Sequence, residues 1–467
     1  MSDAPSDRRA APFAAAMRRA GMPEAAVAAF AFHLERYLDG DTGALGRDRI
    51  EPVAGLPDAV RFEGGAAEGT LTRAVVIKLN GGLGTSMGLE RAKSLIEVRP
   101  GATFLDLMAR QVLALRQRIG RPVPLLLMNS FRTEADTEAA LAAHPDLALP
   151  DLPSGFLQHR VPKVLVDEEA PAEWPADPGL AWCPPGHGDL YTALHTSGVL
   201  RRLLDAGYEV AFASNSDNLG AVLDPALLGH MERSGADFMM EVADRTPADR
   251  KGGHLCRLSS GRLALRESAQ CPPGEADEFQ NIELYRYFNT NNIWVRLSAL
   301  AELLDRHDGA LPLATIVNRK HLDPRDPASP EVVQLETAMG AAISLFDTAV
   351  AVRVPRRRFS PVKNTNDLLG VRSDAFELTG DGRVVLAAGR SAPPTIDLDP
   401  RFFKLLDDFE ARFPAGPPSL LRCTSLTVRG DVSFGDGVIV EGEVTVHGTE
   451  RPSRIPDGAV LRSEHRA

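Results

Sequence analysis

The chain has 467 residues, of which 44% are hydrophobic and 25% are charged. This length and composition are typical of a folded, soluble protein with two or three domains. The formal net charge of −11 disfavours a nucleic acid or an anionic membrane as the main partner, because either would need a broad basic surface. An anionic substrate would therefore have to be held by local cations.

The N-terminus and the cysteines favour a cytoplasmic protein. Arg18 and Arg19 interrupt the apolar N-terminal run, so no signal-peptide core forms, and no other apolar stretch reaches membrane-spanning length. The cysteine spacing fits neither a zinc site nor a dense disulfide framework, which favours a reducing compartment. The cysteines are Cys183, Cys256, Cys271 and Cys423.

Residues 8–38 are rich in alanine, with Met and Phe at helical spacing and a break at Gly21-Met22-Pro23. This pattern predicts two short helices that pack on the main domain. A connector punctuated by Gly and Pro follows, and we expect it to lead into the first strand of a sheet.

From residue 73 onward, apolar strands alternate with amphipathic helices, which predicts a largely parallel sheet with helices on both faces. In such sheets, ligands bind at the carboxyl ends of the strands. Polar residues follow Leu79, Met128 and Ala213 at three of these ends. The predicted elements are strands at 73–79, 123–130 and 208–217 and helices at 103–119 and 190–207.

The first predicted strand runs directly into a glycine-rich loop, VVIKLNGGLGTSMG, at residues 75–88. Glycines let a ligand approach the backbone closely, so a nucleotide or a phosphate is the expected ligand. The loop is not a Walker A motif, because no lysine follows Gly88, and its glycine spacing is one residue too long for the dinucleotide fingerprint. Lys93 follows the loop, where a cation could meet phosphates.

The C-terminal region changes character, because apolar pairs recur there every six residues. A hexapeptide period is the signature of a β-helix, and four consecutive units favour it over a meander of hairpins. The exposed end coil of such a solenoid is a natural assembly surface, although a solenoid can also be a cap. The pairs are Leu426/Val428, Val432/Phe434, Val438/Val440 and Val444/Val446.

The glycine loop, followed by Lys93-Ser94, resembles the signature loop of the eukaryotic-type UTP–glucose-1-phosphate uridylyltransferases, the UDP-glucose pyrophosphorylases. The resemblance runs from about residue 73 to about residue 450 in many blocks of matching order, which is far more specific than one loop. These blocks include LMNSFRTEADT, WCPPGHGDLYTAL, SNSDNLGA, DRKGGHL, FNTNNIWV, LPLATIVNRK, VVQLETAMGAAI and RFSPVKNTNDLL.

The resemblance implies an α/β fold with three parts. A short helical N-terminal segment would span residues 1–55, and a Rossmann-like nucleotidyltransferase domain of the GT-A-like kind, with a mixed sheet flanked by helices, would span 56–395. A left-handed β-helix would span 396–467. The implied partners are UTP and glucose 1-phosphate, with no nucleic acid and no membrane, and a homo-oligomer could form through the β-helix.

The family places the nucleotide on residues that match Leu79, Gly81, Gly82, Met128, Gln158 and Gly186. Gln158 suits the reading of a base, because its amide offers a donor and an acceptor to the uracil edge. Without the resemblance, Gln158 would be interpreted as an exposed loop residue.

Around the phosphates, the resemblance implies roles for His187, Asn215 and Asp217. The attacking phosphate is already ionised at neutral pH, so His187 is expected to form hydrogen bonds rather than act as a base. Asp217 at a strand end is the expected Mg²⁺ ligand, although an Asx turn or a helix cap is its default interpretation. Asn215 faces the same side and could contact sugar or phosphate.

On the sugar side, the family residues match Glu267, Asn289 and Asn291, with backbone from the loop around Gly252. Read alone, Glu267 would be a surface charge, and the segment from Asn289 to Asn292 would be a turn. Lys363 matches a second phosphate-binding lysine, while at least one arginine of residues 356–358 is expected on a solvated patch.

The implied reaction is a single in-line displacement at the α-phosphorus of UTP. Lys93, Lys363 and Mg²⁺ would offset the negative charge, and no covalent intermediate is required. Two departures from the family pattern are Arg91-Ala92, where Gly-Pro is common, and Ser360, where a larger apolar residue is usual.

Three alternatives stay open at this point. A uridylyltransferase for galactose 1-phosphate or an N-acetylhexosamine phosphate, or a broad-specificity UDP-sugar pyrophosphorylase, would keep the loop and change the sugar side. The N-acetylglucosamine relatives carry a different glycine loop, which argues against them. A non-catalytic UDP-sugar-binding or assembly protein would keep the fold, although the retention of Lys93, Asp217 and Lys363 favours activity. A hexapeptide acyltransferase is disfavoured, because the six-residue pattern covers only the tail.

Overall fold

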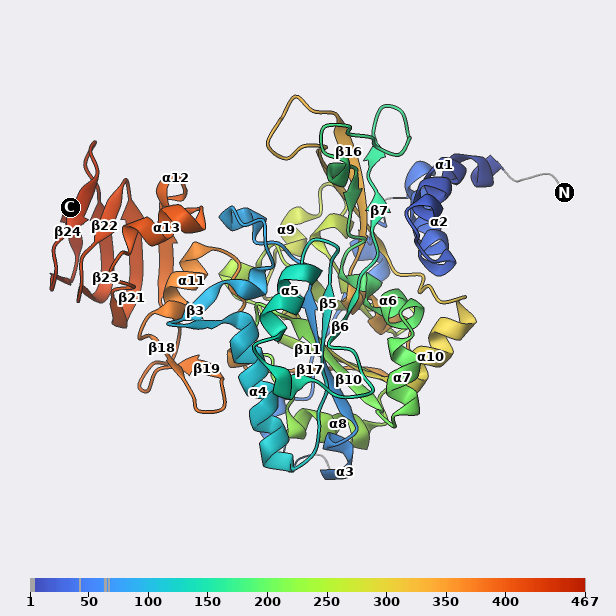
Figure 1. The fold of residues 1–467 in the computed structure, drawn as a ribbon, viewed down its shortest axis with the longest axis horizontal. Coiled ribbons are helices and arrows are strands. Elements are labelled where there is room, and N and C mark those ends of the chain that lie inside the picture. Colours follow the sequence, from blue (N-terminus) through green and yellow to red (C-terminus); the bar gives the residue numbers. More distant parts are fainter. Residues whose placement is uncertain (1–4, 42, 63–64, 66–67, 467) are drawn as a thin grey trace.

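The structure is a computed structural model that describes residues 5–41, 43–62, 65 and 68–466. A mixed sheet with helices on both faces forms the centre, the N-terminal helices lie on one side of it, and a parallel β-structure forms the C-terminal end (Figure 1). Within the described residues, no helix is both long and apolar enough to cross a membrane.

The two predicted N-terminal helices are confirmed as α1 (Pro5–Arg19) and α2 (Glu24–Leu38). Their apolar faces meet at Phe13 and Phe30, whose ring centroids lie 5.7 Å apart. The pair packs against Val161, Val333 and Leu335 in a separate small core. Helical spacing of the apolar residues therefore builds a hairpin that docks on the main body.

The centre of the sheet consists of parallel strands in the order β10 (Val210–Asn215), β2 (Ala74–Asn80), β5 (Leu125–Asn129) and β6 (Gly155–Leu157). The predicted strands at 73–79, 123–130 and 208–217 thus exist and lie side by side. The prediction of a largely parallel sheet is wrong for the other half, because β14 (Tyr287–Arg296) pairs antiparallel with β10.

The strands beyond β14 extend the antiparallel half of the sheet. Both β11 (Phe238–Asp244) and β12 (His254–Leu258) pair antiparallel with β14, and β17 (Ala349–Arg353) adds a parallel pairing to β11. Apolar strand patterns alone do not specify direction, since each strand alternates its faces in the same way whether it runs up or down.

Helices cover both faces of the sheet, as predicted. Alternate residues of β2 divide between two cores, with Val76 facing α4 (Phe104–Ile119) and α8 (Pro225–Ser234). Val75 and Ile77 face α6 (Leu190–Thr196), α7 (Val199–Asp205) and α10 (Leu297–Arg306). The two-residue period of a buried strand explains this division.

Local signals account for where these helices begin and end. A capping box starts α4, in which Asp106 N donates to Thr103 Oγ1 at 3.2 Å and Thr103 N donates to Asp106 Oδ2 at 2.7 Å. The single helix predicted for residues 190–207 is wrong, because Gly198 adopts a φ of 73° between α6 and α7. A left-handed residue of this kind ends a helix.

The six-residue pattern at the C-terminus builds stacked parallel strands and not hairpins. β20 (Thr395–Leu398), β21 (Ser419–Arg429) and β23 (Ile439–His447) pair in parallel, with Leu426 beside Val444 and Val428 beside Val446. The offset of 18 residues corresponds to three hexapeptides per layer. The predicted apolar pairs are all buried, at 0–2% exposure, so they form the interior of this β-structure.

Smaller elements complete the fold. The helices are α3 (Glu68–Leu71), α5 (Glu134–Leu141), α9 (Ala276–Phe279), α11 (Thr365–Arg372), α12 (Pro400–Phe403) and α13 (Leu406–Arg412). The strands are β1 (Ile50–Pro52), β3 (Glu97–Arg99), β4 (Ala102–Thr103), β7 (Val161–Pro162), β8 (Val164–Leu165), β9 (Trp182–Cys183), β13 (Leu263–Arg266), β15 (Thr315–His321), β16 (Glu331–Thr337), β18 (Phe376–Leu378), β19 (Val384–Leu386), β22 (Val432–Phe434), β24 (Ser453–Ile455), β25 (Val460–Leu461) and β26 (Glu464–Arg466).

Candidate active site

The carboxyl ends of three neighbouring parallel strands carry predicted site residues. Leu79 pairs with Met128 on one side and with Asn215 on the other, so the three residues lie in one row across β5, β2 and β10. The next residue along this edge is Gln158, whose backbone N–H donates to Asn129 O at 2.8 Å. The structure therefore brings together residues predicted from four separate blocks of sequence.

The glycine loop leaves this row and makes a close contact that requires glycine. A Cβ atom on Gly81 would lie 2.3 Å from Nε2 of Gln158, so only glycine leaves the amide in its place. The loop then folds back on itself, because Lys93 N donates to Gly82 O at 3.2 Å and Leu83 forms a β-bridge with Ala92. Ala92 has a φ of −55°, close to the value that proline would impose there.

Lys93 and Asp217 meet beside this loop although 124 residues separate them in the chain. Lys93 Nζ lies 2.6 Å from Asp217 Oδ2, and both side chains are largely buried, at 16% and 15% exposure. Asp217 is not a helix cap, since the next helix, α8, is capped by Asp224. Its other oxygen, Oδ1, is buried and has no hydrogen-bond partner among the described residues.

Lys363 approaches from a distant segment of the chain. Its backbone N–H donates to Asp367 Oδ2 at 2.7 Å, in the capping box that starts α11. Burial raises the pKa of Asp367, and the nearby charges of Lys363 and Lys93 oppose that rise. Both lysines therefore act electrostatically on one carboxyl group. Asp367 did not emerge from the sequence analysis, and its signal was the spacing of Asn364 and Asp367 that is typical of a capping box.

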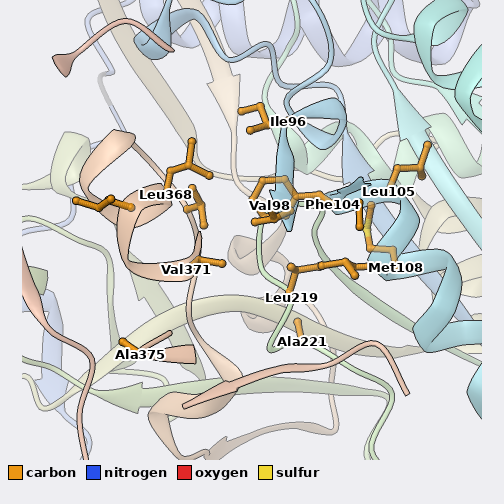
Figure 2. Close-up of a cluster of buried hydrophobic side chains, with 14 of the residues drawn as sticks. Ile96, Val98, Phe104, Leu105, Met108, Leu219, Ala221, Leu368, Val371 and Ala375 are labelled. Carbon is orange, nitrogen blue, oxygen red and sulfur yellow. The ribbon is translucent and has the colours of Figure 1, made fainter. Parts of the chain in front are cut away.

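One hydrophobic cluster anchors the segments that carry Lys93, Asp217 and Lys363. Val98 and Phe104 follow Lys93 in the sequence, Leu219 follows Asp217, and Leu368 follows Lys363, and all four side chains are buried in the same core. Figure 2 shows these side chains together, drawn from three separate segments. Packing therefore fixes the backbones from which the charged groups project.

His187 is held as a neutral hydrogen-bonding group. Gly186 before it has a φ of 80°, and a Cβ atom at that position would lie 2.4 Å from Thr337 O. His187 Nδ1 accepts from the backbone N–H of Met339 at 3.0 Å, which leaves the proton on Nε2. Burial lowers the pKa of His187 to about 4, so the ring is uncharged at neutral pH.

The predicted sugar-side residues Asn289 and Asn291 lie near the start of β14, which runs antiparallel to β10. Asn289 Nδ2 donates to Asn291 Oδ1 at 2.8 Å, and Asn291 N donates back to Asn289 Oδ1 at 3.0 Å. Asn291 adopts a φ of 55°, so this strand contains a local irregularity and is not the simple turn suggested by its composition.

Glu267 belongs to the same region of the site. A Cβ atom on Gly253 would lie 2.4 Å from Glu267 Oε2, and one on Gly252 would lie 2.0 Å from the ring of Phe288. Burial raises the pKa of Glu267 to about 7, and the charge of Lys363 opposes the rise. Glu267 is therefore a recessed group beside the second lysine and not an ordinary surface charge.

The donor set fits one Mg²⁺ ion shared with a phosphate substrate. No group of three or more His, Cys, Asp or Glu side chains suited to a metal occurs in the described part of the chain. Mg²⁺ needs no such cage, because it is usually held by one or two carboxylates together with substrate phosphates and water. The unpartnered Oδ1 of Asp217 is the oxygen that fits this role.

A lysine and a carboxylate from distant segments meet beside the glycine loop at the edge of the sheet. This arrangement suits a nucleotidyltransferase, a class whose chemistry depends on aligned phosphates. The family model described as UTP–glucose-1-phosphate uridylyltransferase matches residues 28–441. The chain belongs to this family.

Relatives and solved structures agree with this assignment. A UTP–glucose-1-phosphate uridylyltransferase of Hordeum vulgare is 44% identical over 403 residues, which cover 85% of this chain and 82% of that protein. The enzyme of Saccharomyces cerevisiae is also 44% identical, over 84% of this chain and 78% of its own.

Among solved structures, the UDP-glucose pyrophosphorylase of Leishmania major superposes with a TM-score of 0.93 at 43% identity, covering 98% of this chain and 99% of that one. A UDP-glucose phosphorylase from Trypanosoma brucei gives a TM-score of 0.92 at 45% identity, covering 98% and 100%. These two structures therefore share the central sheet, the N-terminal helices and the C-terminal β-structure of this chain.

Proposed function

We propose that the chain transfers a uridylyl group from UTP to glucose 1-phosphate and forms UDP-glucose and pyrophosphate. The observation that carries the proposal is the Lys93–Asp217 pair, set at the edge of the sheet beside the glycine loop and within electrostatic range of the segment of Lys363. Relatives at 44% identity carry the name of this activity, which supports the same substrates here.

In the proposed mechanism, the chain aligns two anions and stabilises the charge that develops between them. A phosphate oxygen of glucose 1-phosphate attacks the α-phosphorus of UTP, the new P–O bond forms, and the bond to the pyrophosphate oxygen breaks. Gln158 and the glycine loop hold the uridine, while Glu267, Asn289 and Asn291 hold the glucose hydroxyls. The attacking oxygen is already ionised, so His187 donates a hydrogen bond through Nε2 and removes no proton.

Lys93 and Lys363 supply the positive charge around the reacting phosphates. They belong to distant segments that are anchored in one core, so their charges can offset those on the entering and leaving groups without reorganisation. Bound Mg²⁺, held by Asp217, would supply further charge neutralisation on the phosphates.

We also propose three parts for the chain. Residues 56–395 form a Rossmann-like, GT-A-like catalytic domain, residues 1–55 form the helical segment, and residues 396–467 form a left-handed β-helix. The 18-residue offset between layers supports the β-helix. We further propose that the protein is cytoplasmic and that it forms a homo-oligomer through the β-helix.

The experiment that tests the proposal measures pyrophosphate release from UTP and Mg²⁺ with a panel of sugar 1-phosphates. Asp217→Ala is the test variant, and Asp347→Ala is the matched control, because Asp347 is an exposed carboxylate paired with Arg262. We expect release with glucose 1-phosphate that is lost in Asp217→Ala and kept in Asp347→Ala. Equal rates with several sugars would indicate a broad-specificity enzyme, and no release with any sugar would indicate a binding protein.

A further inference from the structure

The loop that carries Asp217, residues 216–222, lies directly on the segment that carries Lys363, residues 357–363. Val362 N donates to Asp217 O at 3.2 Å, and Asn218 forms a β-bridge with Pro361. A Cβ atom on Gly220 would lie 2.3 Å from Arg357 O, so the two backbones are in contact. The spacing between the carboxylate of Asp217 and the lysine at 363 therefore depends on how these two segments are joined.

The side chain of Asn218 bridges the two segments with both ends of its amide. Its Nδ2 donates to Arg358 O at 3.0 Å, and its Oδ1 accepts from Ser360 N at 3.1 Å. Asn218 is 1% exposed, so water does not compete for these bonds. Removal of this side chain would leave the partly buried N–H of Ser360 and the buried carbonyl of Arg358 each without one partner.

Arg358 ties the same junction to the centre of the sheet. Its guanidinium forms a two-pronged pair with Glu241, with distances of 2.7 Å from Nε to Oε2 and 2.6 Å from Nη2 to Oε1. Glu241 is fully buried and also accepts from Trp294 Nε1 at 2.9 Å and from Asn292 Nδ2 at 3.0 Å. The two-pronged contact fixes the orientation of the guanidinium relative to the carboxylate.

The far end of the loop is held by the same network. Arg358 Nη2 donates to Val222 O at 2.9 Å. Lys78 Nζ, buried below the loop, donates to Ala221 O at 2.7 Å and to Ser214 Oγ at 2.8 Å. At the beginning of the loop, Ser216 N donates to Leu79 O at 3.2 Å, so both ends are fastened to the central sheet.

We propose that Asn218 and Arg358 are positioning residues that set the distance between Asp217 and Lys363. This inference rests on the proposed function for its catalytic consequence, because those two groups are assigned to the phosphates. Neither Asn218 nor Arg358 contacts substrate in this scheme. They act by holding the segment of Lys363 against the loop of Asp217, as the hydrogen bonds and the backbone contact require.

The test compares Asn218→Ala with Lys363→Ala and with the double variant, using kcat for pyrophosphate release. Misplacement of a catalytic group by about 1 Å can cost about 10²-fold, so we expect Asn218→Ala to lower kcat by about 10- to 100-fold. In the Lys363→Ala background, Asn218→Ala should lower kcat by less than about 3-fold, because the side chain that Asn218 positions is absent. If the loss of kcat in the double variant equalled the product of the two single losses, the inference would be overturned.

A second measurement is independent of activity. Asn218→Ala should speed hydrogen exchange at the amides of Ser360 and Val362 by about 10-fold or more, while amides of β2 keep their protection. Asn281→Ala is the matched control, because its Oδ1 accepts from two backbone amides, Glu283 N at 3.0 Å and Leu284 N at 3.1 Å, in a different turn. It should change neither kcat nor exchange at 356–363.

The two readouts separate the failure of this inference from the failure of the proposed function. If the native protein released no pyrophosphate, the function would be wrong, and hydrogen exchange would still decide whether Asn218 holds the segment. If exchange at Ser360 and Val362 were unchanged in Asn218→Ala, the junction would not depend on this side chain and the inference would be refuted. Arg358→Lys, which keeps the charge but loses the two-pronged geometry, should also lower kcat.

Discussion

Gly81→Ala is the substitution that tests the assignment of Gln158 most directly. The added Cβ atom would lie 2.3 Å from Nε2 and 2.9 Å from Cδ of Gln158, well inside the contact distance of about 3.5 Å. The backbone of Gly81 follows β2 directly and has little freedom to move. The amide of Gln158 must therefore shift by about 1 Å, away from the position assigned to the uracil edge.

The size of the effect follows from the hydrogen bonds that are lost. A side-chain amide that reads a base can make two hydrogen bonds, each with a net contribution of about 0.5–1.5 kcal/mol. Loss of both corresponds to about 1–3 kcal/mol, so we expect kcat/KM for UTP to fall by about 5- to 150-fold. Because the clash is confined to the nucleotide side, KM for glucose 1-phosphate should change much less.

The assay is steady-state pyrophosphate release at varied UTP, with Gly55→Ala as the control. Gly55 has no atom within 4 Å of an added Cβ, and its φ is not in the left-handed region, so that variant should behave as the native protein. Gln158→Ala in the Gly81→Ala background should lower kcat/KM for UTP only slightly further, since the same amide is already displaced. An unchanged kcat/KM for UTP in Gly81→Ala would refute the assignment of Gln158 to the base.

Three further predictions concern charge and protonation. Lys93→Ala and Lys363→Ala should each lower kcat by about 10²-fold or more, as removal of a preorganised charge does, and wild-type turnover in both folded variants would contradict the mechanism. Burial raises the pKa of Glu267 to about 7. KM for glucose 1-phosphate should therefore fall as the pH rises through about 7, because the carboxylate is a better hydrogen-bond acceptor than the acid. In Glu267→Gln, KM should not change with pH in this range. Burial lowers the pKa of His254 from 6.5 to about 3, so the unfolded chain takes up the proton first and stability is lost as the pH falls from 6.5 toward 3. His254→Phe keeps the stacking on Tyr285, whose ring centroid is 3.9 Å away. In denaturant titrations, this variant should lose less stability than the native protein as the pH falls. An unchanged dependence of the unfolding free energy on pH would contradict this prediction.

The sequence predicted the elements that depend on local periodicity. The strands that end at Leu79 and Met128 and the helix at 103–119 follow from apolar spacing, because burial of one or both faces imposes a period on the chain. The C-terminal β-structure follows for the same reason, since the pairs Val438/Val440 and Val444/Val446 could be buried only if alternate residues faced one interior. The long blocks from the glycine loop to Lys363 were specific enough to indicate the family.

Other features were beyond the reach of local pattern. The antiparallel direction of β14 depends on which edge of the sheet is free to pair with that strand. The end of α6 at Gly198 depends on a backbone angle that glycine permits but does not require. The roles of Gln158 and Glu267 were implied by resemblance alone, because an isolated polar residue in a loop has no period.

What the sequence by itself determined is therefore the set of elements and the chemical groups that the chain carries. Only the tertiary structure decided which of these groups meet. Lys93 lies 2.6 Å from Asp217 although 124 residues separate them, and Asn218 joins the loop of Asp217 to Ser360, 142 residues away. Such contacts arise from the packing of a shared core, which brings distant segments to one edge of the sheet whatever their separation along the chain.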